Sequence, residues 1–124
     1  MVLFFRRLDA SLELLEANVA LNTEAVRAVG GHVEAMPLEW SNQTHIDGLR
    51  SACLPGAADE FDLVLGSELL YDADNYDSLL HVLSEFAASE STLVVLGYTH
   101  RSGSEARFLA EARTRFVRVE TREF

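Results

Sequence analysis

A carboxylate and a phenol stand three residues apart where residues 67–71 read Ser-Glu-Leu-Leu-Tyr. The apolar run at residues 61–66 comes directly before them and predicts a strand covered on both faces. Ligands of open α/β sheets bind at the carboxyl ends of the strands, so Glu68 and Tyr71 could hold an amine or a hydroxyl group there. An acid in a loop beside a half-buried tyrosine, with no chemical role, is the open alternative.

A second candidate pair, Glu39 and Trp40, follows residues 32–38, whose alternation predicts another strand. Trp40 is the only tryptophan and could stack on a flat ring, although a lone tryptophan in the core is the alternative. A third set of polar groups, Thr99, His100 and Arg101, follows the strand expected at residues 92–98.

Nucleophilic and metal chemistry find little support in the residue types present. Cys53 is the only cysteine, which excludes an internal disulfide, and no basic residue close to it in sequence would activate its thiol. The four histidines lack the spacing of a zinc module: they are His32, His45, His81 and His100.

The charge balance favours a cationic partner. The chain has 20 acids against 10 bases, all of them arginine, and a formal net charge of −10. Residues 34–77 hold ten of the acids and one base, Arg50, which suits a basic or lysine-bearing protein segment, although a solvated acidic surface is the alternative. We expect no binding to nucleic acid or membranes. The start of the chain does not read as a signal peptide, so we expect a cytoplasmic protein, with the nucleus as an alternative.

The elements that must position these groups alternate along 124 residues, which is enough for one domain. We expect strands at residues 2–5, 32–38, 61–66, 92–98 and 116–120 and helices at 9–21, 75–88 and 104–115. Residues 41–60 are expected to form a loop, which could include one helical turn. A further helical turn is expected at 23–29. This order predicts an α/β sandwich on a largely parallel sheet. The expected core includes Leu15, Val19, Leu63, Leu65, Leu83, Val94 and Leu109.

Two of these segments resemble the signature of a known enzyme family. Residues 38–40 (Leu-Glu-Trp) and 61–72 (Phe-Asp-Leu-Val-Leu-Gly-Ser-Glu-Leu-Leu-Tyr-Asp) resemble the seven-β-strand lysine methyltransferases of the methyltransferase-like protein 21 group. The similarity continues through residues 12–22, 92–98 and 101–116, so it covers nearly the whole chain. An acid-Trp pair followed by Glu-x-x-Tyr is fairly specific in this order, whereas either piece alone would be weak.

The resemblance implies a Rossmann-like fold that uses S-adenosylmethionine to methylate lysine in proteins. It assigns Trp40 to the adenine end of the cofactor site, Glu39 to the position beside it, and Ser67 to a cofactor contact after the strand. Glu68 and Tyr71 would border the methyl donor and the target amine, and they would act by alignment of the reacting groups.

The chain also departs from the family pattern. The family carries a glycine-rich turn after its first strand and an acid for the ribose after its second. None of the seven glycines here forms a G-x-G motif, and Arg6 and Arg7 stand near the expected ribose acid, with Asp9 the nearest carboxylate. We therefore expect one partial domain over residues 1–124, without the first strand, its turn and the closing strands. Such a chain is either an enzyme that needs the missing segment or a non-catalytic acidic interaction module derived from a methyltransferase.

Overall fold

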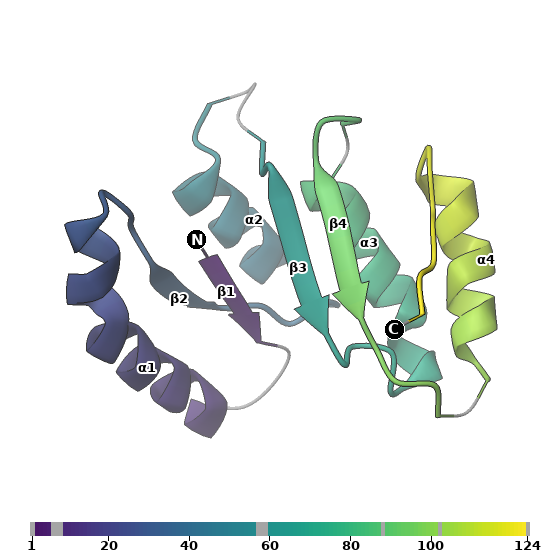
Figure 1. The fold of residues 1–124 in the computed structure, drawn as a ribbon, viewed down its shortest axis with the longest axis horizontal. Helices are drawn as coiled ribbons and strands as arrows, with labels where there is room; N and C mark the ends of the chain where they lie inside the picture. Colours follow the sequence, from purple (N-terminus) through teal and green to yellow (C-terminus); the bar gives the residue numbers. More distant parts are fainter. Residues whose placement is uncertain (1, 6–8, 57–59, 88, 102, 124) are drawn as a thin grey trace. The chain divides into compact units, whose positions relative to one another are not determined.

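The computed structural model describes residues 2–5, 9–56, 60–87, 89–101 and 103–123 (Figure 1). The chain divides into two compact units, Met1–Pro55 and Gly56–Phe124. Each unit combines helices with one pair of parallel strands, so the predicted α/β fold class is confirmed. That residues 1–124 form a single domain stays a prediction.

The first unit is built around two parallel strands, β1 (Val2–Phe5) and β2 (Glu34–Pro37). The helix α1 (Asp9–Ala28) connects them, as parallel strands require a long crossover. A second helix, α2 (Gln43–Cys53), follows β2. The pairing puts Val2 opposite Glu34 and continues in register to the ends of both strands.

The helix α1 is continuous over the range in which we expected a helix and a separate turn. The hydroxyl of Thr23 donates to the carbonyl oxygen of Val19 at 2.7 Å, so this polar side chain is accommodated without a break. The helix ends close to Gly30, whose φ of 76° is in the left-handed region that glycine tolerates. Leu15 is buried as predicted, whereas Val19 is only partly buried.

The helix α2 corrects the prediction of a loop over this segment. The side chain of Asn42 accepts hydrogen bonds from two backbone N–H groups of the first turn, at 3.1 and 3.4 Å, and so caps the helix. Ile46 and Leu49 lie on one face and are both buried. The prediction was wrong because the segment contains many residues that favour turns and only one buried apolar pair. Asn42 also favours turns, but here it caps the helix.

The second unit pairs β3 (Leu63–Ser67) with β4 (Leu93–Gly97) in parallel, with Leu63 opposite Leu93. A short 3₁₀ helix, η1 (Ala73–Asn75), leads into α3 (Tyr76–Phe86), and α4 (Glu105–Arg115) follows β4. The side chain of Asp72 caps η1 by accepting from the N–H of Asp74. These helices and strands agree with the predicted ones to within about three residues at each end, which is ordinary scatter in assignment.

The helix α3 runs back along the strand pair and supplies most of the core of this unit (Figure 1). Near its end, the ring of Phe86 meets Phe61 edge to face at a centroid distance of 5.7 Å, while Tyr76 at its start meets Phe108 of α4 at 5.3 Å. Leu83 is buried as predicted, and Leu109 is partly buried. The apolar face of α3 therefore packs against Phe61, before β3, and against Phe108 of α4.

One face of the strand pair is exposed, which contradicts the predicted burial of Leu63 and Leu65. Successive side chains of a strand point to opposite faces, and Val64 takes the buried face of β3. Leu93 and Val95 of β4 are exposed opposite the two leucines, and Val94 is only partly buried. The near-continuous apolar run predicted two covered faces, whereas the structure covers one.

The strand predicted at residues 116–120 is also wrong. Phe116 has extended backbone, but residues 116–123 form no strand. An alternating segment becomes a strand only when another strand pairs with it.

Within the described part of the chain no helix is long and apolar enough to cross a membrane.

Two leucines of the second unit provide a matched test of this arrangement. Leu80→Ala should lower the free energy of unfolding by about 2–5 kcal/mol, because Leu80 is 0% exposed and its loss leaves a cavity. Leu65→Ala should lower it by about 1 kcal/mol or less, because Leu65 is 62% exposed. Urea unfolding followed by circular dichroism measures both. Equal losses would show that the face carrying Leu65 is covered in solution.

Candidate functional site

The carboxyl end of β3 brings Ser67 and Glu68 to the edge of the strand pair. Ser67 is the last residue of β3 and lies opposite Gly97 of β4. Glu68 follows with a φ of 55°, and its N–H donates to the carbonyl oxygen of Gly97 at 2.7 Å. A left-handed conformation costs a non-glycine residue about 1–2 kcal/mol, and such residues concentrate at functional sites. The chain turns sharply here, which directs Glu68 toward the loop after β4.

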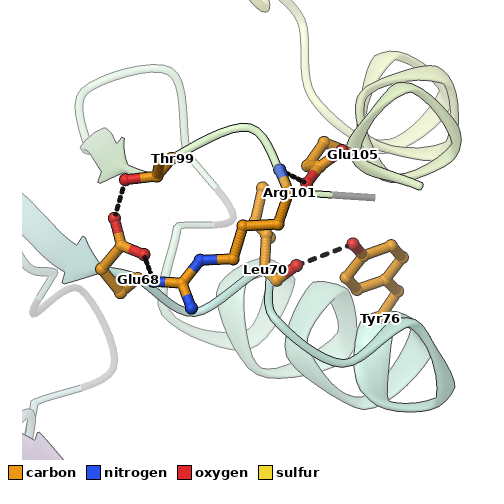
Figure 2. A network of polar contacts seen from close by, with 6 residues as sticks. All are labelled: Glu68, Leu70, Tyr76, Thr99, Arg101 and Glu105. Atoms are coloured by element: carbon orange, nitrogen blue, oxygen red, sulfur yellow. Dashed lines mark hydrogen bonds and ion pairs between the residues drawn. The ribbon is translucent and has the colours of Figure 1, made fainter. Parts of the chain in front are cut away.

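Two side chains of that loop hold the carboxylate of Glu68 (Figure 2). The hydroxyl of Thr99 donates to Oε1 at 2.9 Å, and Nη2 of Arg101 donates to Oε2 at 2.7 Å. The hydrogen bond from Thr99, together with the ion pair to Arg101, holds the pKa of Glu68 below its usual range, while partial burial opposes this shift. Glu68 is therefore ionised at neutral pH, and each of its oxygens already has a partner.

The loop that carries Arg101 is itself anchored by a buried acid. Glu105, the first residue of α4, is 1% exposed, and its Oε1 accepts from the backbone N–H of Arg101 at 2.9 Å. Nδ1 of His100 lies 3.7 Å from the other oxygen of Glu105. Because this contact uses the backbone of Arg101, it fixes the loop and leaves the guanidinium group to Glu68.

A second bridge joins the same two loops through Tyr76. Its hydroxyl donates to the carbonyl oxygen of Leu70 at 2.9 Å (Figure 2). The same hydroxyl lies 2.9 Å from the hydroxyl of Ser104. Ser104 directly precedes α4, and its side chain makes no capping hydrogen bond. Sequence reasoning missed both Tyr76 and Glu105. The signal for Tyr76 was its position in the apolar stripe of α3, whereas an acid at a helix start looks like an ordinary exposed residue.

Tyr71 lies three residues beyond Glu68 in the same loop and is 58% exposed. The structure thus places both predicted residues of the Glu-x-x-Tyr element after β3, as the strand prediction required. It adds Thr99 and Arg101 as the partners of the carboxylate. A role for Tyr71 toward an amine stays a prediction.

Glu39 and Trp40 belong to the first unit, in the turn after β2. Trp40 is 6% exposed and contributes to the core of that unit. Glu39 is exposed, and its backbone N–H donates to Nδ1 of His45 at 3.2 Å. The role of this pair toward a cofactor stays a prediction, as does its arrangement relative to Glu68. Arg6 and Arg7 lie outside the described residues.

The described residues offer no support for a nucleophilic cysteine or a metal site. Burial raises the pKa of the Cys53 thiol, and the nearby charge of Glu34 raises it further, so the thiol stays protonated at neutral pH. Among the residues described, no three His, Cys, Asp or Glu side chains gather closely enough to hold a metal ion.

The arrangement at the ends of β3 and β4 offers a fixed, ionised carboxylate beside a guanidinium group at an exposed edge. An ionised carboxylate can accept hydrogen bonds from an amine and orient it. It is poorly suited to abstract a proton at neutral pH, because its pKa lies below the usual range. The site is thus suited to chemistry that depends on alignment.

The chain is similar to a known protein family. A family described as lysine methyltransferase matches residues 4–115, a range that includes both candidate pairs and the loop after β4. In a search of curated proteins none matched. The family match covers all but the first three and the last nine residues. The chain therefore belongs to the lysine methyltransferase family.

Proposed function

We propose that this chain transfers the methyl group of S-adenosylmethionine to a lysine side chain of a protein, as an enzyme of the methyltransferase-like protein 21 group. The observation that carries this function is the fixed carboxylate of Glu68 at the carboxyl end of β3. That is where an α/β sheet binds its ligand. The family match over residues 4–115 supplies the reaction class.

The residue types near both candidate pairs suit this cofactor. S-adenosylmethionine supplies an electrophilic methyl group on a positively charged sulfur. Glu39 offers a carboxylate for hydroxyl or ammonium groups, Trp40 a ring for the base, and Ser67 a hydroxyl at the strand end. A Cβ atom built on Gly97 would meet nothing within 4 Å, so the strand end opposite Ser67 has open space.

The contribution of the chain to catalysis would be alignment. A lysine amine must present its lone pair, so it must be neutral and correctly oriented when it reacts. Glu68 would accept a hydrogen bond from the amine, and the phenol of Tyr71 could provide a second polar contact. Both groups are at the exposed edge, where a side chain from another protein can reach them.

The acidic composition supports a basic partner. Ten acids and one base between residues 34 and 77 would attract a lysine-bearing segment at long range. We propose that the chain acts in the cytoplasm, with the nucleus as an alternative. The attraction should weaken with ionic strength, so the apparent KM for the protein substrate should rise as salt is added.

Binding of cofactor to residues 1–124 alone should be weak. In the described residues each sheet has two strands, although parallel sheets normally have more and are covered on both faces. No G-x-G motif is present, so we expect that a further strand with its glycine-rich turn is needed. Loss of such a turn would remove several hydrogen bonds of about 1 kcal/mol each.

Calorimetric titration with S-adenosylmethionine tests this expectation. The 124-residue chain should show a dissociation constant well above the micromolar range. A form extended at its amino terminus with the family's first strand and turn should bind at least about tenfold more tightly, since 1.4 kcal/mol corresponds to a factor of ten. A micromolar constant for the 124-residue chain would show that no further strand is needed. Absence of binding and of methylation in both forms would favour the non-catalytic acidic module instead.

Substitutions at the two candidate pairs, made in the form extended at its amino terminus, should separate their roles. Glu68→Ala should lower kcat about tenfold or more with little change in cofactor affinity, because misalignment acts on the chemical step. Trp40→Ala should chiefly weaken cofactor binding through lost ring contact. Transfer of radiolabelled methyl groups to proteins of a cell extract measures turnover, and calorimetry measures affinity.

The control for Glu68 is Glu90→Ala, which removes another exposed acid. It should leave both quantities unchanged. If Glu68→Ala behaves like this control, Glu68 has no part in the reaction and is an ordinary loop acid.

A further inference from the structure

The loop after β4 supplies both partners of the Glu68 carboxylate. Thr99 and Arg101 reach it across the parallel strand pair, from more than thirty positions further along the chain. The buried Glu105 holds the backbone of Arg101, and Tyr76 ties the loop of Glu68 to Ser104. The position of the guanidinium group therefore results from several anchored contacts.

We propose that Thr99 and Arg101 are positioning residues, which fix the carboxylate of Glu68 and offset its charge so that an arriving lysine amine is not held as an ammonium ion. This role rests on the proposed function. It extends the site from the Glu-x-x-Tyr element to the loop after β4.

The reason lies in the protonation of the substrate. A bare carboxylate favours the charged form of a nearby amine and so raises its pKa, whereas a carboxylate paired with a guanidinium group does so much less. The amine must first lose a proton to solvent. Its lone pair then forms the new N–C bond while the C–S bond breaks, and that electron pair stays on sulfur. An arginine beside Glu68 thus increases the reactive fraction of the amine at neutral pH.

Several titratable groups face this pair from the surrounding elements. Among the described residues, Arg101 is a cation in contact with the carboxylate of Glu68. Tyr71 lies in the same loop as Glu68. From α4, Glu105 lies against the backbone of Arg101, with His100 at 3.7 Å from its second oxygen. Protonation of His100 would also change the local charge, so His100→Gln is needed as a separate control for any pH effect.

The first experiment needs no activity. The carboxyl signal of Glu68 in the ¹³C-labelled 124-residue chain is followed by NMR against pH for the wild type, Arg101→Gln and Arg101→Lys. Arg101→Gln should raise the apparent pKa of Glu68 toward its usual value, and Arg101→Lys should keep it low. Thr99→Val should also raise it. An unchanged titration in both Arg101→Gln and Thr99→Val would overturn the pairing.

A matched arginine controls for general loss of charge. Arg107 pairs with Glu111 at 2.8 Å on α4, and Arg107→Gln should leave the titration of Glu68 unchanged. Arg101→Gln should remain folded, because the side chain of Arg101 is 61% exposed and its backbone contact to Glu105 is retained. Circular dichroism checks this.

The second experiment measures kcat against pH in the form that turns over in the methylation assay. Arg101→Gln should shift the rising limb of the profile to higher pH and lower kcat at neutral pH at least about threefold. Arg101→Lys should restore both, and His100→Gln should leave the limb in place. A pH profile of unchanged position would overturn the positioning role even if the NMR titration shows the pair. Absence of turnover in every variant, wild type included, would overturn the proposed function and this role with it, while the NMR result would still decide whether the pair exists.

Discussion

Parallel pairing of β3 with β4 is the constraint on which the candidate site depends. Because both strands run in the same direction, the segments that follow them leave from the same edge. The register puts Ser67 opposite Gly97, so the residues that follow the two strands, Glu68 and the loop of Thr99 and Arg101, come within hydrogen-bond distance. A shift of one residue would turn each side chain to the other face and would separate these groups.

The contacts around Glu68 matter more for geometry than for stability. Ion pairs exposed to solvent add little to the free energy of folding, and the Glu68–Arg101 pair is partly exposed on both sides. The left-handed conformation of Glu68 itself disfavours folding. The buried contacts nearby, from Tyr76 to Leu70 and from Glu105 to the backbone of Arg101, keep the two loops in place. The buried contacts thus stabilise the two loops, and the exposed ion pair sets the orientation of the Glu68 carboxylate.

The parallel pairing also gathers apolar side chains on the uncovered face of the second unit. Leu63 and Leu65 lie opposite Leu93 and Val95, so four apolar side chains form one exposed patch. A continuous apolar run is the pattern of a strand buried on both faces, and this run keeps that pattern although the described residues cover one face only. The pattern is therefore consistent with a sheet of more than two strands.

The sequence by itself determined the alternation of helices and strands, the parallel α/β class and the position of Glu68 at a strand end, since local periodicity and apolar runs decide these. It did not reveal α2, because the buried pair Ile46 and Leu49 stood among turn-forming residues. Only the tertiary structure decided that residues 116–120 form no strand and that one face of β3 is exposed, because both depend on which partners come close. It also decided that Thr99 and Arg101 contact Glu68 and that Glu105 is buried. Residue spacing along the chain contains no information about such contacts until the strand register brings distant segments together.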